Sequence, residues 1–156
     1  MDCMSGEKPF HILIVEDNLG DVRLMQEALS EGSVPCSLQI AADGLEALDI
    51  LHRSPRFSAA IRPDLIFLDV NLPGISGMHV LEDIKSDSVL RQIPVIVLST
   101  SSAEQDIYEA YDLHANCYIT KPIDLDMFMR GIRLISEFWF TMAKLPRKET
   151  EWTAMT

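Results

Sequence analysis

The sequence is poor in cysteine and has no long hydrophobic run. Its three cysteines (Cys3, Cys36 and Cys117) are odd in number and widely spaced, which argues against a disulfide framework or a zinc site and favours a reducing compartment. The longest aliphatic runs, such as 65–68 and 95–98, fall far short of the roughly 18 residues of a membrane span. No apolar segment typical of a signal peptide precedes Phe10. We therefore expect a cytoplasmic protein without membrane attachment.

Positive charge is also scarce. Lysine and arginine together number 13, against 24 aspartates and glutamates, so the net charge is −11. A protein that follows the phosphates of a nucleic acid needs a basic face, and this balance argues against that function. The acid excess is compatible with a divalent cation or with a basic surface on a partner protein.

The chain has the length and composition of one globular domain. Of its 156 residues 47% are hydrophobic and 24% are charged, and it contains no repeat or low-complexity segment. Short aliphatic runs alternate with amphipathic stretches. They predict buried strands at 12–15, 38–41, 64–69, 95–98 and 117–119, each followed by a helix, at 19–30, 44–51, 77–85, 103–113 and 125–142. This alternation of strands and helices predicts an α/β fold with a doubly wound, five-stranded parallel sheet at 10–142. An N-terminal arm at 1–9 and a tail at 143–156 would flank it.

Polar side chains follow the predicted strands at the ends that a parallel sheet brings to one edge. They are Glu16, Asp17, Asp69, Ser99, Thr100 and Lys121. Three carboxylates placed together repel one another; Lys121 can supply one compensating charge and a hard cation such as Mg²⁺ the rest. A carboxylate nucleophile, a metal, a lysine and a hydroxyl are the parts needed for phosphoryl transfer.

We interpret Asp21 as the second half of a capping box that begins at Asn18, rather than as a ligand.

Several motifs in fixed order match a known family. They are Val15-Glu16-Asp17-Asn18, Leu68-Asp69, Leu72-Pro73-Gly74, Gly77, the run 94–99 and Lys121-Pro122, with 30 residues from Asp69 to Ser99 and 22 from Ser99 to Lys121. Over residues 10–140 the chain resembles the receiver domain of two-component response regulators, which implies a flavodoxin-like fold. The segments 18–21, 111–113, 116–122, 138–139 and 144–146 resemble stand-alone regulators that partner phytochrome-type histidine kinases.

The resemblance implies a role for each residue of the site. Asp69 would be the phosphoacceptor, with Lys121 paired to it and later to the phosphoryl oxygens. Asp17 would bind Mg²⁺ directly and Glu16 through water, and Asn71 would offer its backbone carbonyl to the ion. The implied function is a signalling phosphoacceptor that takes a phosphoryl group from a phosphohistidine, catalyses its own phosphorylation and dephosphorylation, and is not a turnover enzyme.

The resemblance also implies a switch. Ser99 would be the hydroxyl that moves to the phosphoryl group; the 30-residue spacing favours it over Thr100. Tyr118 occupies the switch-aromatic position, and the Lys121–Pro122 peptide is expected to be cis. Because few residues follow the last helix, we expect the output to pass through contact with another protein.

The last helix bears on the oligomeric state of the protein, and two alternatives to the leading function stay open. Phe138, Trp139, Phe140 and Met142 spread around much of the last helix, more than one core face can bury. Part of this surface could pack under the C-terminal tail, and a homodimer seam is the slightly favoured alternative. A vestigial receiver, acting as a binding module without phosphorylation, is the main alternative function. A phosphatase of similar fold would need a second aspartate where Asn71 stands.

Overall fold

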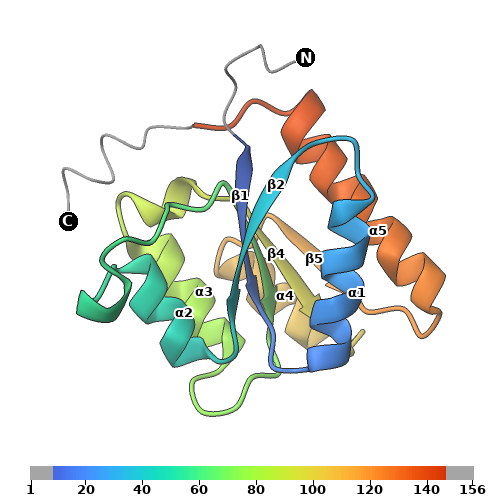
Figure 1. Ribbon diagram of the computed structural model, residues 1–156. Helices are drawn as coiled ribbons and strands as arrows, with labels where there is room; N and C mark the ends of the chain where they lie inside the picture. Colours follow the sequence, from blue (N-terminus) through green and yellow to red (C-terminus); the bar gives the residue numbers. More distant parts are fainter. Residues whose placement is uncertain (1–8, 147–156) are drawn as a thin grey trace.

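The computed structural model describes residues 9–146, so most of the expected arm and tail lies outside the described residues. Within them lie five strands and five α-helices: β1 Phe10–Val15, α1 Leu19–Ser30, β2 Cys36–Ala41, α2 Gly44–Leu51, β3 Leu65–Asp69, α3 Gly77–Ser86, β4 Val95–Ser99, α4 Glu104–Asp112, β5 Cys117–Thr120 and α5 Leu125–Glu137. The strands form one parallel sheet in the order β2-β1-β3-β4-β5 (Figure 1). The predicted doubly wound sheet is confirmed.

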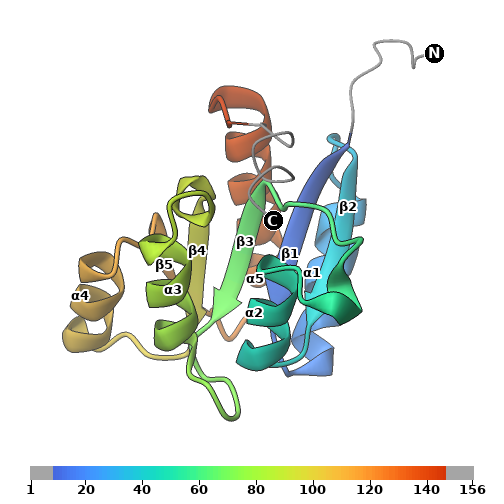
Figure 2. The ribbon, with the colours of Figure 1, turned by 90° about the vertical axis from the view of Figure 1, so that its left-hand side faces the viewer.

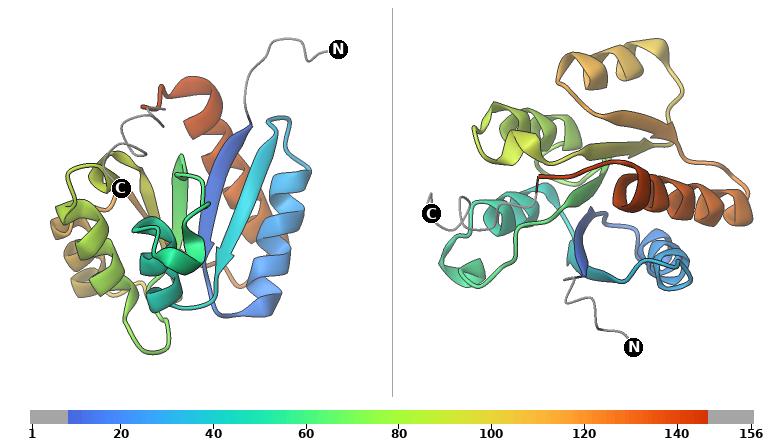
Figure 3. Two further views of the ribbon diagram at one scale, coloured as in Figure 1. Left: turned by 60° about the vertical axis from the view of Figure 1, so that its left-hand side comes forward. Right: turned by 90° about the horizontal axis from the view of Figure 1, so that it is seen from above.

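Helices cover both faces of the sheet. Helices α1 and α5 lie on one face and α2, α3 and α4 on the other (Figure 3). Every residue of β3 and of β4 is buried, as expected for central parallel strands. Successive side chains enter opposite layers: Ile66 and Leu68 pack with α2 and α3, whereas Leu65 and Phe67 pack with α1 and α5. The sheet is thus covered on both faces, and the carboxyl ends of its strands lie along one edge, the lower edge in Figure 2.

The end of the last helix differs from the prediction. The α-helix stops at Glu137, and a π-helical turn, Phe138–Met142, follows it. Phe140 points inward and stacks on Phe10, with ring centroids 4.1 Å apart and an angle of 10° between the planes. Phe140 is therefore a core residue, and its expected place in an exposed dimer seam is wrong. Phe138 and Met142 are exposed.

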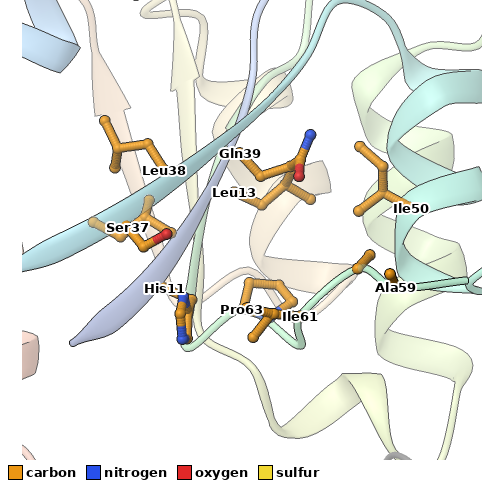
Figure 4. A pocket seen from close by; sticks show the side chains of 11 residues that line it. His11, Leu13, Ser37, Leu38, Gln39, Ile50, Ala59, Ile61 and Pro63 are labelled. Carbon is orange, nitrogen blue, oxygen red and sulfur yellow. The ribbon is translucent and has the colours of Figure 1, made fainter. Parts of the chain in front are cut away.

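A small hollow lies at the opposite edge of the sheet. It has a volume of about 150 Å³, and His11, Ser37, Gln39, Ile50 and Pro63 are among its lining residues (Figure 4). Its place beside the first residues of β1 and β2 separates it from the acidic residues that follow β1 and β3. None of the described helices is long and apolar enough to cross a membrane.

Candidate functional site

Three of the predicted carboxylates meet at the carboxyl edge of the sheet. Glu16 follows β1 and is 2% exposed, Asp69 ends β3 and is 4% exposed, and Asp17 is exposed beside them. One oxygen from each lies within 4.8 Å of the others. An all-oxygen set of this size and openness fits a hard divalent cation that keeps some of its water.

Lys121 lies at the centre of the acidic cluster. Its ammonium donates hydrogen bonds to Glu16 Oε1 at 2.8 Å, to Asp69 Oδ2 at 2.9 Å and to Asp21 Oδ2 at 2.9 Å. The lysine side chain is only 10% exposed, so these contacts are poorly screened by solvent. The lysine therefore neutralises part of the repulsion that the carboxylates would otherwise exert on one another.

Asp21 is the site residue that the sequence interpretation missed. Its backbone N–H donates to Asn18 Oδ1 at 3.0 Å, which confirms Asn18 as the N-cap of α1. The capping box is wrong, because the Asn18 N–H donates to Glu16 and the Asp21 carboxylate turns to Lys121 instead. The available signal was its place in the first turn of a helix that begins two residues after Asp17.

Burial and crowding shift the acid–base behaviour of the cluster. Burial raises the pKa of Glu16 from 4.5 to about 7, and a hydrogen bond with Asp69 adds to the rise. Burial would also raise the pKa of Asp69, but hydrogen bonds with Glu16, the Asn71 N–H and Lys121 outweigh this and hold it below its ordinary value. Burial lowers the pKa of Lys121, and its hydrogen bonds to carboxylates outweigh that and raise it. Without a cation, the crowding of the two carboxyl groups therefore favours a proton on Glu16 over one on Asp69.

The raised pKa of Glu16 predicts an unusual pH dependence of stability. A carboxyl group whose pKa is higher in the folded chain binds more protons when folded, so stability is lost as pH rises from about 4.5 through about 7. We expect the metal-free protein to lose on the order of 1–3 kcal/mol of unfolding free energy over this range, and Mg²⁺ to restore it. Urea unfolding at a series of pH values, with EDTA or with Mg²⁺, measures both effects. Glu16→Gln should flatten the metal-free curve; an equally steep loss in that variant would contradict the assignment.

The backbone around Asp69 is held by its neighbours. Asp69 Oδ1 accepts a hydrogen bond from the Asn71 N–H at 2.8 Å, and the Gly77 N–H donates to the Val70 carbonyl at 3.2 Å. A Cβ added to Gly77 would lie 2.4 Å from both the Asp69 carbonyl oxygen and Val70 Cα. The family motif therefore needs glycine at 77 because α3 begins directly against the backbone of Asp69. The implied role of the Asn71 carbonyl as a metal ligand stays a prediction.

Gly77→Ala should accordingly destabilise the fold. The added methyl group would meet backbone, which cannot move as a flexible side chain could, so we expect a loss of roughly 1–3 kcal/mol. Gly131→Ala is the matched control, because a Cβ there meets nothing within 4 Å and alanine favours a helix interior by roughly 0.5–1 kcal/mol. Chemical unfolding measures the midpoint of each variant. Equal midpoints for Gly77→Ala and Gly131→Ala would contradict the close approach at Gly77.

The two predicted switch residues bind one segment between β4 and α4. Ser99 is fully buried, and its hydroxyl accepts from the Ser101 N–H at 3.0 Å. The Tyr118 hydroxyl donates to the Ser101 carbonyl at 2.9 Å, and the Ser101 hydroxyl donates to Asp106 in α4 at 2.6 Å. Ser101 therefore joins the carboxyl end of β4 and the side chain of Tyr118 in β5 to the first turn of α4.

The expected cis peptide is not observed. The described residues contain no cis peptide bond, so Lys121–Pro122 is trans. The Lys121 N–H donates to the Ser99 carbonyl at 2.7 Å, and the side chain reaches its carboxylates from this conformation. Trans is also the intrinsically preferred form of a bond before proline.

The fold and the site together define a receiver domain. The family model described as "Response regulator receiver domain" matches residues 12–133, and the chain belongs to that family. Response regulator Rcp1 of Synechocystis sp. is 41% identical over 145 residues, which cover 92% of this chain and 99% of the relative.

Two solved structures are similarly close. The phosphorylated cyanobacterial phytochrome response regulator RcpA is 48% identical, with a TM-score of 0.86, and the match covers 89% of this chain and 99% of that one. The Mn²⁺-bound form of Rcp1 is 41% identical, with a TM-score of 0.85, covering 88% and 99%. These likenesses confirm the predicted family and fold.

Proposed function

We propose that the protein accepts a phosphoryl group from a phosphohistidine onto Asp69 and signals through contact with other proteins. The observation that carries the proposal is the hydrogen bond from Lys121 to Asp69, whose carboxylate also belongs to the Glu16–Asp17–Asp69 cluster. An Asp69 oxygen attacks the phosphorus while the phosphorus–nitrogen bond breaks and its electron pair returns to the imidazole. Lys121 holds charge on the phosphoryl oxygens.

Glu16, Asp17 and Asp69 would hold Mg²⁺, since their oxygens lie close enough together to share one ion. The bound ion would supply positive charge to the phosphoryl oxygens during transfer. Asp69 itself supplies the nucleophile, and the Asn71 N–H orients that carboxylate through its hydrogen bond. Ser99 and Tyr118 then provide the switch, since both are bound to Ser101 and a change at either is passed to α4.

We infer that the donor is a sensor histidine kinase of the phytochrome type. Support comes from the similarity to the phytochrome response regulator RcpA and from exposed apolar surface beside Lys121. A cleft of about 280 Å³ lined by Thr100, Lys121 and Ile123 opens there, and Ile123 is 99% exposed. Exposed apolar surface beside a charged site is typical of a surface that a partner protein contacts.

The donor chemistry can be tested directly. Phosphoramidate, which carries a phosphorus–nitrogen bond, and acetyl phosphate should both label the protein in the presence of Mg²⁺, and EDTA should abolish labelling. A phosphate monoester such as p-nitrophenyl phosphate should not be hydrolysed at enzymic rates. Labelling by no donor would favour the vestigial binding module, and rapid ester turnover would favour a phosphatase.

We also propose a homodimer through the outer face of α5 and the turn after it. Phe138 and Met142 are exposed, and Trp139 packs edge-on against Phe138 with centroids 5.5 Å apart. Phe138→Ser should weaken dimerisation at least about tenfold by removing a large apolar contact. Sedimentation over a concentration series measures this, with Leu45→Ser on α2 as the control for loss of an exposed apolar side chain. Unchanged association of the Phe138 variant would contradict this seam.

A further inference from the structure

Lys121 is bound by three carboxylates, and Asp21 differs from the other two. Glu16 and Asp69 also belong to the cluster whose oxygens could share a metal ion. Asp21 does not belong to that cluster among the described residues, yet its oxygen lies as close to the ammonium, at 2.9 Å, as that of Asp69. Among the three carboxylate partners of Lys121, Asp21 is therefore the one outside the candidate metal cluster.

The start of α1 holds Asp21 in place. The Asn18 side chain accepts from the Asp21 N–H and so fixes its backbone in the first helical turn. Val22, the next residue, is buried, which fixes the rotation of the helix. The Asp21 side chain is 28% exposed, against 10% for Lys121, so its carboxylate approaches the ammonium from the more open side.

We propose that Asp21 is a positioning residue that keeps the Lys121 ammonium in place while Asp69 is phosphorylated. This inference rests on the proposed function. A lysine ammonium has three N–H donors, and here each has a carboxylate partner. When Asp69 bonds to phosphorus, the Lys121 N–H that had donated to the Asp69 carboxylate turns to a phosphoryl oxygen. Asp21 limits the movement of a side chain with several rotatable bonds during that exchange.

The test is the rate of phosphorylation by phosphoramidate, measured by intact mass over a series of Mg²⁺ concentrations. Asp21→Ala should lower the rate at saturating Mg²⁺ about tenfold, the size expected for one charge-assisted hydrogen bond. Asp21→Asn should fall between this variant and the wild type, because an amide oxygen accepts more weakly. The Mg²⁺ concentration for half-maximal rate should change by less than about threefold. Glu27→Gln, an exposed charge removal on α1, should match the wild type.

Two results would overturn the inference. One is a saturating rate for Asp21→Ala within about twofold of the wild type. The other is a loss that excess Mg²⁺ reverses, which would make Asp21 part of the metal site. If the wild-type protein itself is not phosphorylated, the proposed function fails; if the wild type reacts and Asp21→Ala reacts equally well, the inference alone fails.

Discussion

Asp69→Asn should abolish phosphorylation by every donor. The amide nitrogen and oxygen are poor nucleophiles, and no other described carboxylate both contacts Lys121 and receives the Asn71 N–H. The variant should remain folded, because an amide fits the same space and its oxygen can still accept from the Asn71 N–H. Intact mass after incubation with phosphoramidate and Mg²⁺ measures the loss.

The control for this variant is Asp17→Asn. It removes an exposed carboxylate from the same cluster and should weaken Mg²⁺ binding while leaving the phosphoacceptor itself intact. Excess Mg²⁺ should then rescue part of the rate for Asp17→Asn and none for Asp69→Asn. Equal labelling of Asp69→Asn and wild type would contradict the assignment of the phosphoacceptor.

Lys121→Ala should slow phosphorylation by at least about a hundredfold. It removes the positive group that lies 2.9 Å from Asp69, in surroundings where solvent screens charge poorly. The same change frees Glu16 and Asp69 from the ammonium, so Mg²⁺ should bind the unphosphorylated variant more tightly. Rates by intact mass and Mg²⁺ affinity by calorimetry separate the two effects.

Lys121→Arg is the matched variant for charge. A planar guanidinium retains the charge but cannot place three donors as the ammonium does, so its rate should lie between those of Lys121→Ala and the wild type. A rate for Lys121→Ala within about threefold of the wild type would contradict the role of the lysine.

The buried strands and the edge on which the site lies are predictable from sequence. Continuous aliphatic runs mark β3 and β4 because both faces of these strands are covered. The pattern predicts the second strand only at 38–41, whereas β2 begins at Cys36, since an edge strand with exposed Ser37 and Gln39 lacks such a run. Parallel pairing then brings the residues after β1, β3 and β5 together.

The directions of individual side chains are less predictable. Asp21 stands in the first helical turn beside the N-cap, and its carboxylate also binds Lys121 in the site. Its spacing in the sequence fits both roles and does not distinguish between them. A regular helix would expose part of the aromatic cluster that includes Phe140, whereas the π-helical turn places Phe140 against Phe10. Both differences depend on tertiary contacts between segments far apart in sequence.

Mapping the position of the phosphoryl group tests the proposed role of Asp69 as the phosphoacceptor. The protein is phosphorylated with phosphoramidate and Mg²⁺, the acyl phosphate is reduced with borohydride, and peptides are sequenced by mass spectrometry. We predict one modified residue, Asp69, which is recovered as homoserine. Modification at a histidine, at another carboxylate or at no residue would contradict it.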